Sequence, residues 1–174
     1  RVGVRGQPVV GEAMQVGRDV VLSEYVNIPI HIAHVSCRMS ADIIAWAKKR
    51  GAKVTAETTP HYLLLDESEM EGYNTLAKVN PPLGSPGDRE AVREAVKNGT
   101  IDIIVTDHAP HIAMEKNTTL DLAPNGITGL DLSLTLIWSL AGDGVITEAD
   151  LIRLMAEKPA EIFGLPCCRF NPGD

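Results

Sequence analysis

Apolar and polar positions along the chain fall into two alternating patterns. Short β-branched apolar runs predict strands at residues 29–35, 52–57, 77–80 and 101–106. Apolar residues at helical spacing and helix-start signals predict helices at residues 11–25, 40–51, 85–98, 129–140 and 159–163, and another from residue 147. Strands that alternate with helices of about 10–15 residues predict βαβ units and a parallel sheet.

Particular side chains mark the starts and faces of the predicted helices. Ser40 is placed to cap one helix, and capping-box patterns at residues 85–88 and 147–150 open two others. Trp46 and Trp138 lie on helical faces and are expected in the core. The apolar residues at helical spacing in the first helix are Met14, Val21, Leu22 and Tyr25.

The fold class predicted from this order is α/β. Four consecutive strand–helix units are half of a (β/α)8 TIM-type barrel, whose active sites lie at the carboxyl ends of the strands. A flavodoxin-like open sheet is the competing architecture. That fold would place a phosphate-binding, glycine-rich turn after the first strand, and residues 34–37 hold no glycine. The sequence therefore favours a partial barrel.

Composition places the chain among ordinary globular proteins of acidic character. Of its 174 residues, 44% are hydrophobic and 22% are charged, and the formal net charge is −7. This charge, without a cluster of Lys and Arg, argues against a nucleic-acid or anionic-membrane surface. No apolar run approaches the about 20 residues of a membrane span, and no signal peptide is visible. Cys37, Cys167 and Cys168 form neither a disulfide framework nor a zinc knuckle, so we interpret them as small apolar residues and expect a reducing cytoplasm.

The two ends of the chain suggest that it is part of something larger. It opens at Arg1 without an initiator methionine and closes on the turn-forming run Asn171-Pro172-Gly173-Asp174. We therefore expect residues 1–166 to form the barrel unit and residues 167–174 to form a tail that leads out of it.

Polar side chains gather where the predicted strands end. The strand at 101–106 stops at Asp107, which His108 and His111 follow, and Pro110 prevents simple continuation. The exits of the other predicted strands carry His34, Glu57 with His61, and Asn80. Imidazole and carboxylate groups without thiolate suit zinc or a similar divalent ion in an open catalytic site. The local pattern also allows Asp107 to cap a turn and the histidines to be solvated loop residues.

His31 and His34 receive separate interpretations. They are three residues apart on a strand, so they point to opposite faces and cannot jointly hold one ion in regular geometry. His34 lies at the carboxyl end and is the candidate ligand. His31 is interpreted as a packed or hydrogen-bonded histidine.

Five segments together resemble dihydroorotase, of the cyclic amidohydrolase superfamily. They are residues 31–36, 54–65, 78–83, 106–111 and 158–166. The likeness runs from about residue 11 to residue 166, and the most specific of the motifs is Thr106-Asp107-His108-Ala109-Pro110-His111. Asn80, in its Val-Asn-Pro-Pro setting, favours dihydroorotase over allantoinase and hydantoinase, which the other segments resemble almost as well.

The resemblance implies a zinc-dependent barrel, with one or two ions, that reversibly closes N-carbamoyl-L-aspartate to L-dihydroorotate in pyrimidine biosynthesis. On this likeness, His34 matches the metal ligand of the fifth barrel strand. Asp107 matches the eighth-strand aspartate, which holds metal and moves the proton. His61 matches a family histidine to which we assign no ligand role.

The resemblance also implies a substrate site. Asn80 and His111 match substrate-binding positions, and Asn125 with Gly126 matches a loop pair that contacts the pyrimidine ring through its backbone. The long connection from residue 108 to residue 125 is read as a lid or binding loop, because structureless loops rarely exceed about 15 residues. Phenylalanine commonly stands at the position of Asn125 and glutamate at the position of Asp131.

Several family residues precede the region that resembles dihydroorotase. These are the first-strand histidine pair, a substrate arginine, a bridging aspartate or carboxylated lysine, and a further histidine. One histidine and one aspartate fall short of the three protein ligands of a catalytic zinc site. We therefore expect the carboxyl-terminal half of a barrel, inactive alone, that needs the missing half or a partner such as a second copy or aspartate transcarbamoylase. An allantoinase or hydantoinase, a non-catalytic scaffold and a flavodoxin-like binding domain stay open as alternatives.

Overall fold

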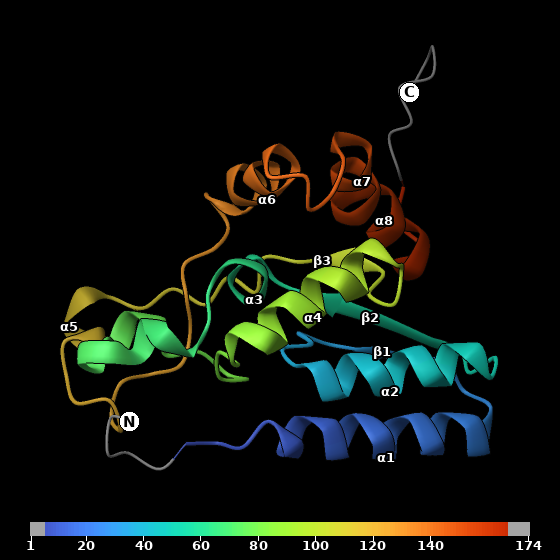
Figure 1. Cartoon of the computed structure of the whole chain (residues 1–174), viewed down its shortest axis with the longest axis horizontal. Coiled ribbons are helices and arrows are strands. Elements are labelled where there is room, and N and C mark those ends of the chain that lie inside the picture. The colour runs from blue at the N-terminus through green and yellow to red at the C-terminus, as the bar shows by residue number, and fades with distance from the viewer. Residues whose placement is uncertain (1–5, 167–174) are drawn as a thin grey trace.

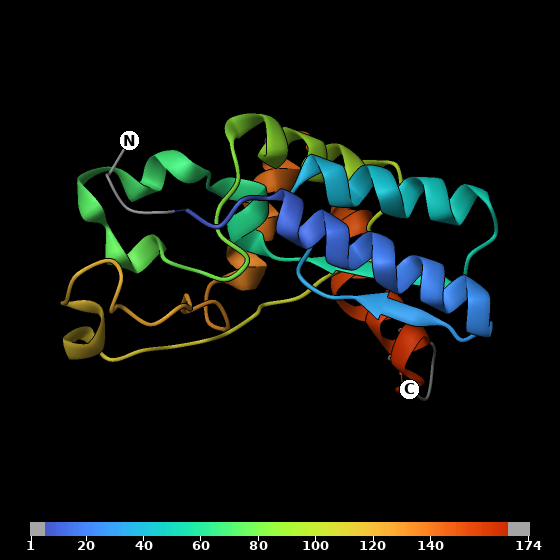
Figure 2. The ribbon, with the colours of Figure 1, turned by 90° about the horizontal axis from the view of Figure 1, so that it is seen from below.

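A three-stranded parallel sheet forms the centre of the computed structural model, which describes residues 6–166. The strands are β1 (Ile30–Ile32), β2 (Val54–Thr58) and β3 (Ile103–Ile104), and they lie in the order β1-β2-β3. Helices flank both sides of this sheet (Figures 1 and 2). The parallel order confirms the predicted partial barrel, because each strand is followed by helical chain that returns it to the same direction.

Eight α-helices and three other helical segments connect and cover the strands in the described part of the chain. The α-helices are α1 (Val10–Val26), α2 (Arg38–Lys49), α3 (Pro60–Leu64), α4 (Pro86–Lys97), α5 (Ala113–Lys116), α6 (Ser133–Gly142), α7 (Glu148–Ile152) and α8 (Lys158–Phe163). The other segments are the 3₁₀ helices Glu67–Tyr73 and Thr75–Ala77 and the π-helix Arg153–Glu157. None of the described helices combines the length and apolarity needed to cross a membrane.

The strand predicted at residues 77–80 is wrong. A 3₁₀ helix covers its start, and the carbonyl of Lys78 accepts a hydrogen bond from the amide of Gly126 at 2.9 Å instead of joining a neighbouring strand. The described part of the barrel therefore holds three strands. If β3 is the eighth barrel strand, as the resemblance implies, then β1 is the sixth, and His34 follows the sixth strand and not the fifth.

Helix α1 forms where predicted, but the apolar side chains that predicted it face solvent. Met14 is 71% exposed and Tyr25 is 86% exposed, whereas Ala13, Val16 and Val20 are buried. Small side chains on the buried face let α1 approach α2 closely. The expectation that Trp46 and Trp138 lie in the core is also wrong. They are 49% and 53% exposed, and Trp46 lies 4.7 Å beneath the guanidinium of Arg50.

The two predicted capping boxes are confirmed. Ser85 and Asp88 exchange hydrogen bonds at the start of α4, and Thr147 and Asp150 do so at the start of α7. Ser40 does not cap α2, because that helix begins two residues earlier, and the buried Ser40 hydroxyl lies 3.2 Å from the sulfur of Cys37. Cys37 is a buried free thiol; Cys167, Cys168 and the predicted tail lie outside the described residues.

Candidate active site

Three polar side chains follow the three strands at one edge of the sheet. His34 follows β1, His61 lies in the first turn of α3 just after β2, and Asp107 follows β3. Because the strands are parallel, their carboxyl ends meet at this edge. Nε2 of His61 lies 3.8 Å from Oδ2 of Asp107, and His34 acts electrostatically on His61. The predicted convergence of His34 and Asp107 at one edge is therefore seen in the structure.

The backbone turns sharply at both flanking positions. His34 has φ 40° and Asp107 has φ 44°, in the left-handed region that side chains other than glycine seldom adopt. At each residue the regular alternation of side chains along the strand therefore ends, and the backbone turns away from the sheet. Such conformations cost about 1–3 kcal/mol each and concentrate at functional sites.

His61 is a neutral, buried imidazole at the centre of this edge. It is 6% exposed, and burial, followed by the charge of His34, lowers its pKa to about 4. Its buried Nε2 has no hydrogen-bond partner among the described residues, and neither does the buried Nδ1 of His34. The sequence placed His61 at a strand exit, but we assigned it no ligand role on the family resemblance.

These donors fit one part of a divalent metal site. The buried nitrogens of His34 and His61 are without partners, that of His61 lies near the Asp107 carboxylate, and neutral imidazole is the form that binds metal. Within residues 6–166, however, no group of three His, Cys, Asp or Glu side chains is arranged to hold an ion. Three protein ligands are usual in catalytic zinc sites, so further ligands would be required.

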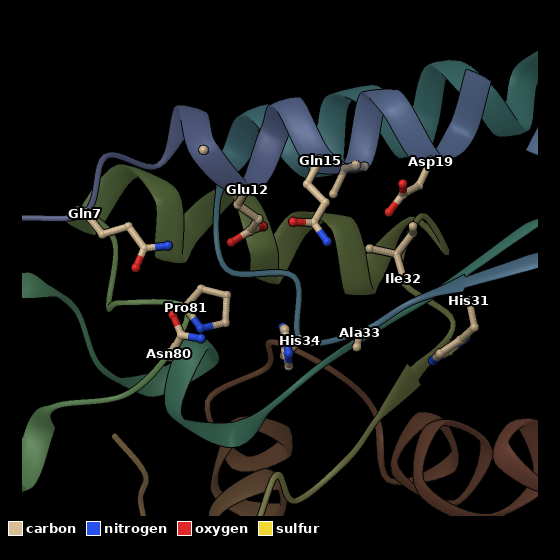
Figure 3. A pocket seen from close by; sticks show the side chains of 12 residues that line it. Gln7, Glu12, Gln15, Asp19, His31, Ile32, Ala33, His34, Asn80 and Pro81 are labelled. Atoms are coloured by element: carbon tan, nitrogen blue, oxygen red, sulfur yellow. The ribbon is translucent and has the colours of Figure 1, made fainter. Parts of the chain in front are cut away.

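Glu12 on α1 supports the loop that carries His34, a role that the sequence analysis missed. Its carboxylate accepts hydrogen bonds from the amide of Ser36, at 3.1 Å, and from the Ser36 hydroxyl. Figure 3 shows Glu12, His34 and Asn80 around one pocket of about 470 Å³, between α1 and the β1 exit. Nothing in the local sequence around Glu12 marked this contact, because it joins residues 24 apart.

The predicted substrate-binding residues come from two segments that the structure brings together. Asn80 lines the pocket beside His34. Nε2 of His111 lies 3.0 Å from the carbonyl oxygen of Asn125. Gly126 has φ 142°, and a Cβ there would lie 2.5 Å from the carbonyl oxygen of Ala109, so only glycine fits this close backbone approach. The Gly126 amide donates a hydrogen bond to the carbonyl oxygen of Lys78, two residues before Asn80.

His31 and His108 have structural partners. The ring nitrogens of His31 lie 2.8 Å from the Thr55 hydroxyl and 2.8 Å from the Glu57 carboxylate, which confirms the interpretation of His31 as hydrogen-bonded. Nδ1 of His108 accepts hydrogen bonds from two backbone amides, those of Gly129 and Leu130. Neither Glu57 nor His108 therefore joins the group at the strand edge.

Comparison with known proteins finds relatives along nearly the whole chain. Residues 21–173 match the amidohydrolase family. The chain is 50% identical over 165 residues to dihydroorotase of Acetivibrio thermocellus and 45% identical over 172 residues to dihydroorotase of Syntrophus aciditrophicus. These matches cover 94% and 99% of this chain, which spans 39–40% of the length of these curated relatives.

Solved structures give the same result for the fold. L-hydantoinase (dihydropyrimidinase) from Arthrobacter aurescens superposes with a TM-score of 0.86 at 30% identity, over 91% of this chain and 36% of that protein. Dihydropyrimidinase from Brevibacillus agri gives a TM-score of 0.86 at 25% identity, over 91% of this chain and 36% of that protein. Together with the family match over residues 21–173, these likenesses show that the chain belongs to the amidohydrolase family.

Proposed function

We propose that this chain supplies the last three strands, and with them part of the active site, of a dihydroorotase. The reaction is the reversible closure of N-carbamoyl-L-aspartate to L-dihydroorotate and water, a step of pyrimidine biosynthesis. The observation that carries the proposal is the meeting of Asp107, His61 and His34 at the carboxyl edge of the sheet. The choice of substrate is supported by relatives named dihydroorotase that are 45–50% identical.

Asp107 is proposed to move the proton. In ring closure the ureido nitrogen forms a bond to the side-chain carboxyl carbon, and the proton it loses passes to the Asp107 carboxylate. The C–O bond then breaks, and the oxygen leaves as water with that proton and a second proton taken up from solvent. In the reverse direction, Asp107 returns a proton to the amide nitrogen as the ring opens. His61 stays neutral beside Asp107 because its burial disfavours the imidazolium.

The metal side of the proposal uses His34 and Asp107 as ligands. A divalent cation held there, for which zinc suits the donors, would polarise the carbonyl group that is a poor electrophile alone. Glu12 would keep His34 in place through its hydrogen bonds to Ser36.

The substrate side uses Asn80, His111 and the backbone of Asn125 and Gly126. Amide and imidazole donors suit the carboxylate and carbonyl oxygens of the proposed substrate. Gly126 lets the backbone of this pair pass close to the Ala109 carbonyl, beside His111, which keeps the two substrate-binding segments together.

The proposal is tested with a hybrid enzyme. In it, this chain replaces the segment that it matches in the Acetivibrio thermocellus dihydroorotase. With zinc, we expect the hybrid to interconvert N-carbamoyl-L-aspartate and L-dihydroorotate, whereas the 174 residues alone should show no turnover. Zinc content and circular dichroism of the hybrid identify failed folding.

A cyclic amidohydrolase of another specificity is the second candidate, because the solved structures that this fold resembles include hydantoinases. A folded, zinc-loaded hybrid that opens hydantoin or allantoin but not dihydroorotate would replace the proposal with that candidate. A folded, zinc-loaded hybrid without any activity would favour the non-catalytic scaffold. A cytoplasmic location, a homodimer and an aspartate transcarbamoylase partner stay predictions.

A further inference from the structure

Lys116 is a buried lysine in the long connection that the sequence analysis read as a lid or binding loop. It is 5% exposed, at the end of the short helix α5. Burial, followed by the nearby charge of Lys78, lowers the pKa of its ammonium group. Buried lysines are rare unless their charge is satisfied, so the partners of this group need explanation.

The ammonium group of Lys116 donates to three backbone carbonyls. Nζ lies 3.2 Å from the carbonyl oxygen of Thr75, 3.2 Å from that of Lys78 and 2.9 Å from that of Pro124. An ammonium group has three donors, and each of these contacts uses one. The Thr75 hydroxyl in turn donates to the carbonyl oxygen of Lys116.

These three carbonyls belong to the two segments that end at the proposed substrate-binding residues. Thr75 and Lys78 precede Asn80, and Pro124 immediately precedes Asn125. The Lys78 carbonyl is shared, because it also accepts the hydrogen bond of the Gly126 amide at 2.9 Å. Nζ of Lys78 also links the two segments, because it donates to the carbonyl oxygens of Asp121 and Ala123 at 3.1 and 2.6 Å.

We propose that Lys116 is a positioning residue that fixes Asn80 and the Asn125–Gly126 pair relative to each other, as one wall of the substrate site. The long connection then forms a fixed wall of the substrate site and not a lid that opens freely. We call the three hydrogen bonds of Lys116 that hold it the tether. The part of this inference that concerns substrate rests on the proposed function, whereas the tether itself does not.

The tether is tested by backbone hydrogen exchange on the complete 174-residue chain. In Lys116→Met, three half-buried carbonyls lose a charged donor, so the Gly126 amide and residues 74–80 should exchange about ten- to hundredfold faster. Amides of α4 and β2 should not change. The matched control is Lys97→Met, at an exposed lysine of α4, which should leave all these amides as they are.

Two exchange outcomes would overturn the tether: unchanged exchange at Gly126, or equal acceleration throughout the sheet, which would indicate only a general loss of stability. If Lys116→Met fails to fold, Lys116→Ala with added propylammonium provides the second test. Propylammonium replaces the missing stem and charge and should slow exchange at Gly126, whereas propanol should not. Equal effects of propylammonium and propanol would contradict a role for the charge.

The substrate role is tested in the hybrid enzyme. We expect Lys116→Ala to raise KM about tenfold with little change in kcat, because the wall binds substrate but does no chemistry. Propylammonium should restore KM. A fall in kcat at unchanged KM would overturn the positioning role. An inactive hybrid whose Gly126 amide still responds to Lys116→Met would contradict the proposed function and leave the tether standing.

Discussion

Two regions of the site are held in place by different means. They are the strand-edge group (His34, His61 and Asp107) and the loop wall (Asn80, Asn125 and Gly126). His34, His61 and Asp107 directly follow strands or begin a helix after one, so the sheet fixes their positions. Asn80 and the Asn125–Gly126 pair lie outside the strands, where the ammonium groups of Lys78 and Lys116 hold their segments by donating to backbone carbonyls. Under the proposed function, the chemistry is therefore placed on the rigid sheet, and substrate fit is placed on loop segments, which vary more readily.

Removal of the carboxylate of Asp107, the proposed proton-transfer group, should have the largest effect. In the hybrid enzyme, Asp107→Asn should lower kcat about 1,000-fold, because an amide cannot accept and return a proton. The rate of dihydroorotate hydrolysis measures this. Asp143→Asn, at an exposed acid after α6, is the control and should keep full activity. If Asp107→Asn were nearly as active as the control, a catalytic role for the strand edge would be contradicted.

The loop wall is tested by adding one methyl group. Gly126→Ala should destabilise the 174-residue chain by about 2–4 kcal/mol, because the new Cβ would approach the Ala109 carbonyl oxygen at 2.5 Å from a left-handed backbone. Gly99→Ala is the matched control. Gly99 also has positive φ but open space around it, so its cost should be about 1–2 kcal/mol. Urea unfolding compares the two, and equal costs would contradict the close approach.

The support of the strand edge by α1 should have a smaller effect. Glu12→Gln weakens the acceptor for the Ser36 amide and hydroxyl, so we expect a loss of about 1–2 kcal/mol in unfolding free energy and weaker zinc binding by the hybrid. Glu24→Gln, which alters a surface ion pair with Arg50, should cost less than about 0.5 kcal/mol. Normal zinc affinity of the Glu12→Gln hybrid would contradict a role for α1 in supporting the metal site.

The smallest effect is expected far from both regions, in the capping box of α7. Hydrogen bonds from Thr147, with Arg153, lower the pKa of Asp150 from 3.8 to about 2. A lowered pKa in the folded state means that this stabilisation is complete above pH 3.8 and is lost as pH falls towards 2. Asp150→Asn should therefore cost less than about 1 kcal/mol at neutral pH, and the difference from the parent chain should shrink in acid. A difference independent of pH would contradict the role of the charge.

The strand edge could be predicted from sequence, because apolar runs that end in Asp107 and His34 mark strands and their exits. The loop wall could not be derived from pattern, and the resemblance alone pointed to Asn80, Asn125 and Gly126. The strand predicted at 77–80 failed because its first amides bond locally in a 3₁₀ turn. The Lys78 carbonyl accepts from Gly126 and Lys116, more than 35 positions away, instead of pairing with a strand. Local pattern carries no information about such long-range partners, which also explains why Glu12 and the role of Lys116 were missed.

The position of a bound zinc ion tests the central claim most directly. Anomalous diffraction at the zinc edge, on crystals of the zinc-loaded hybrid, locates the ion. We predict a peak about 2.0–2.2 Å from a ring nitrogen of His34 and from a carboxylate oxygen of Asp107. Zinc bound elsewhere, with neither side chain in contact, would contradict the assignment of this strand edge as the metal side of an amidohydrolase site.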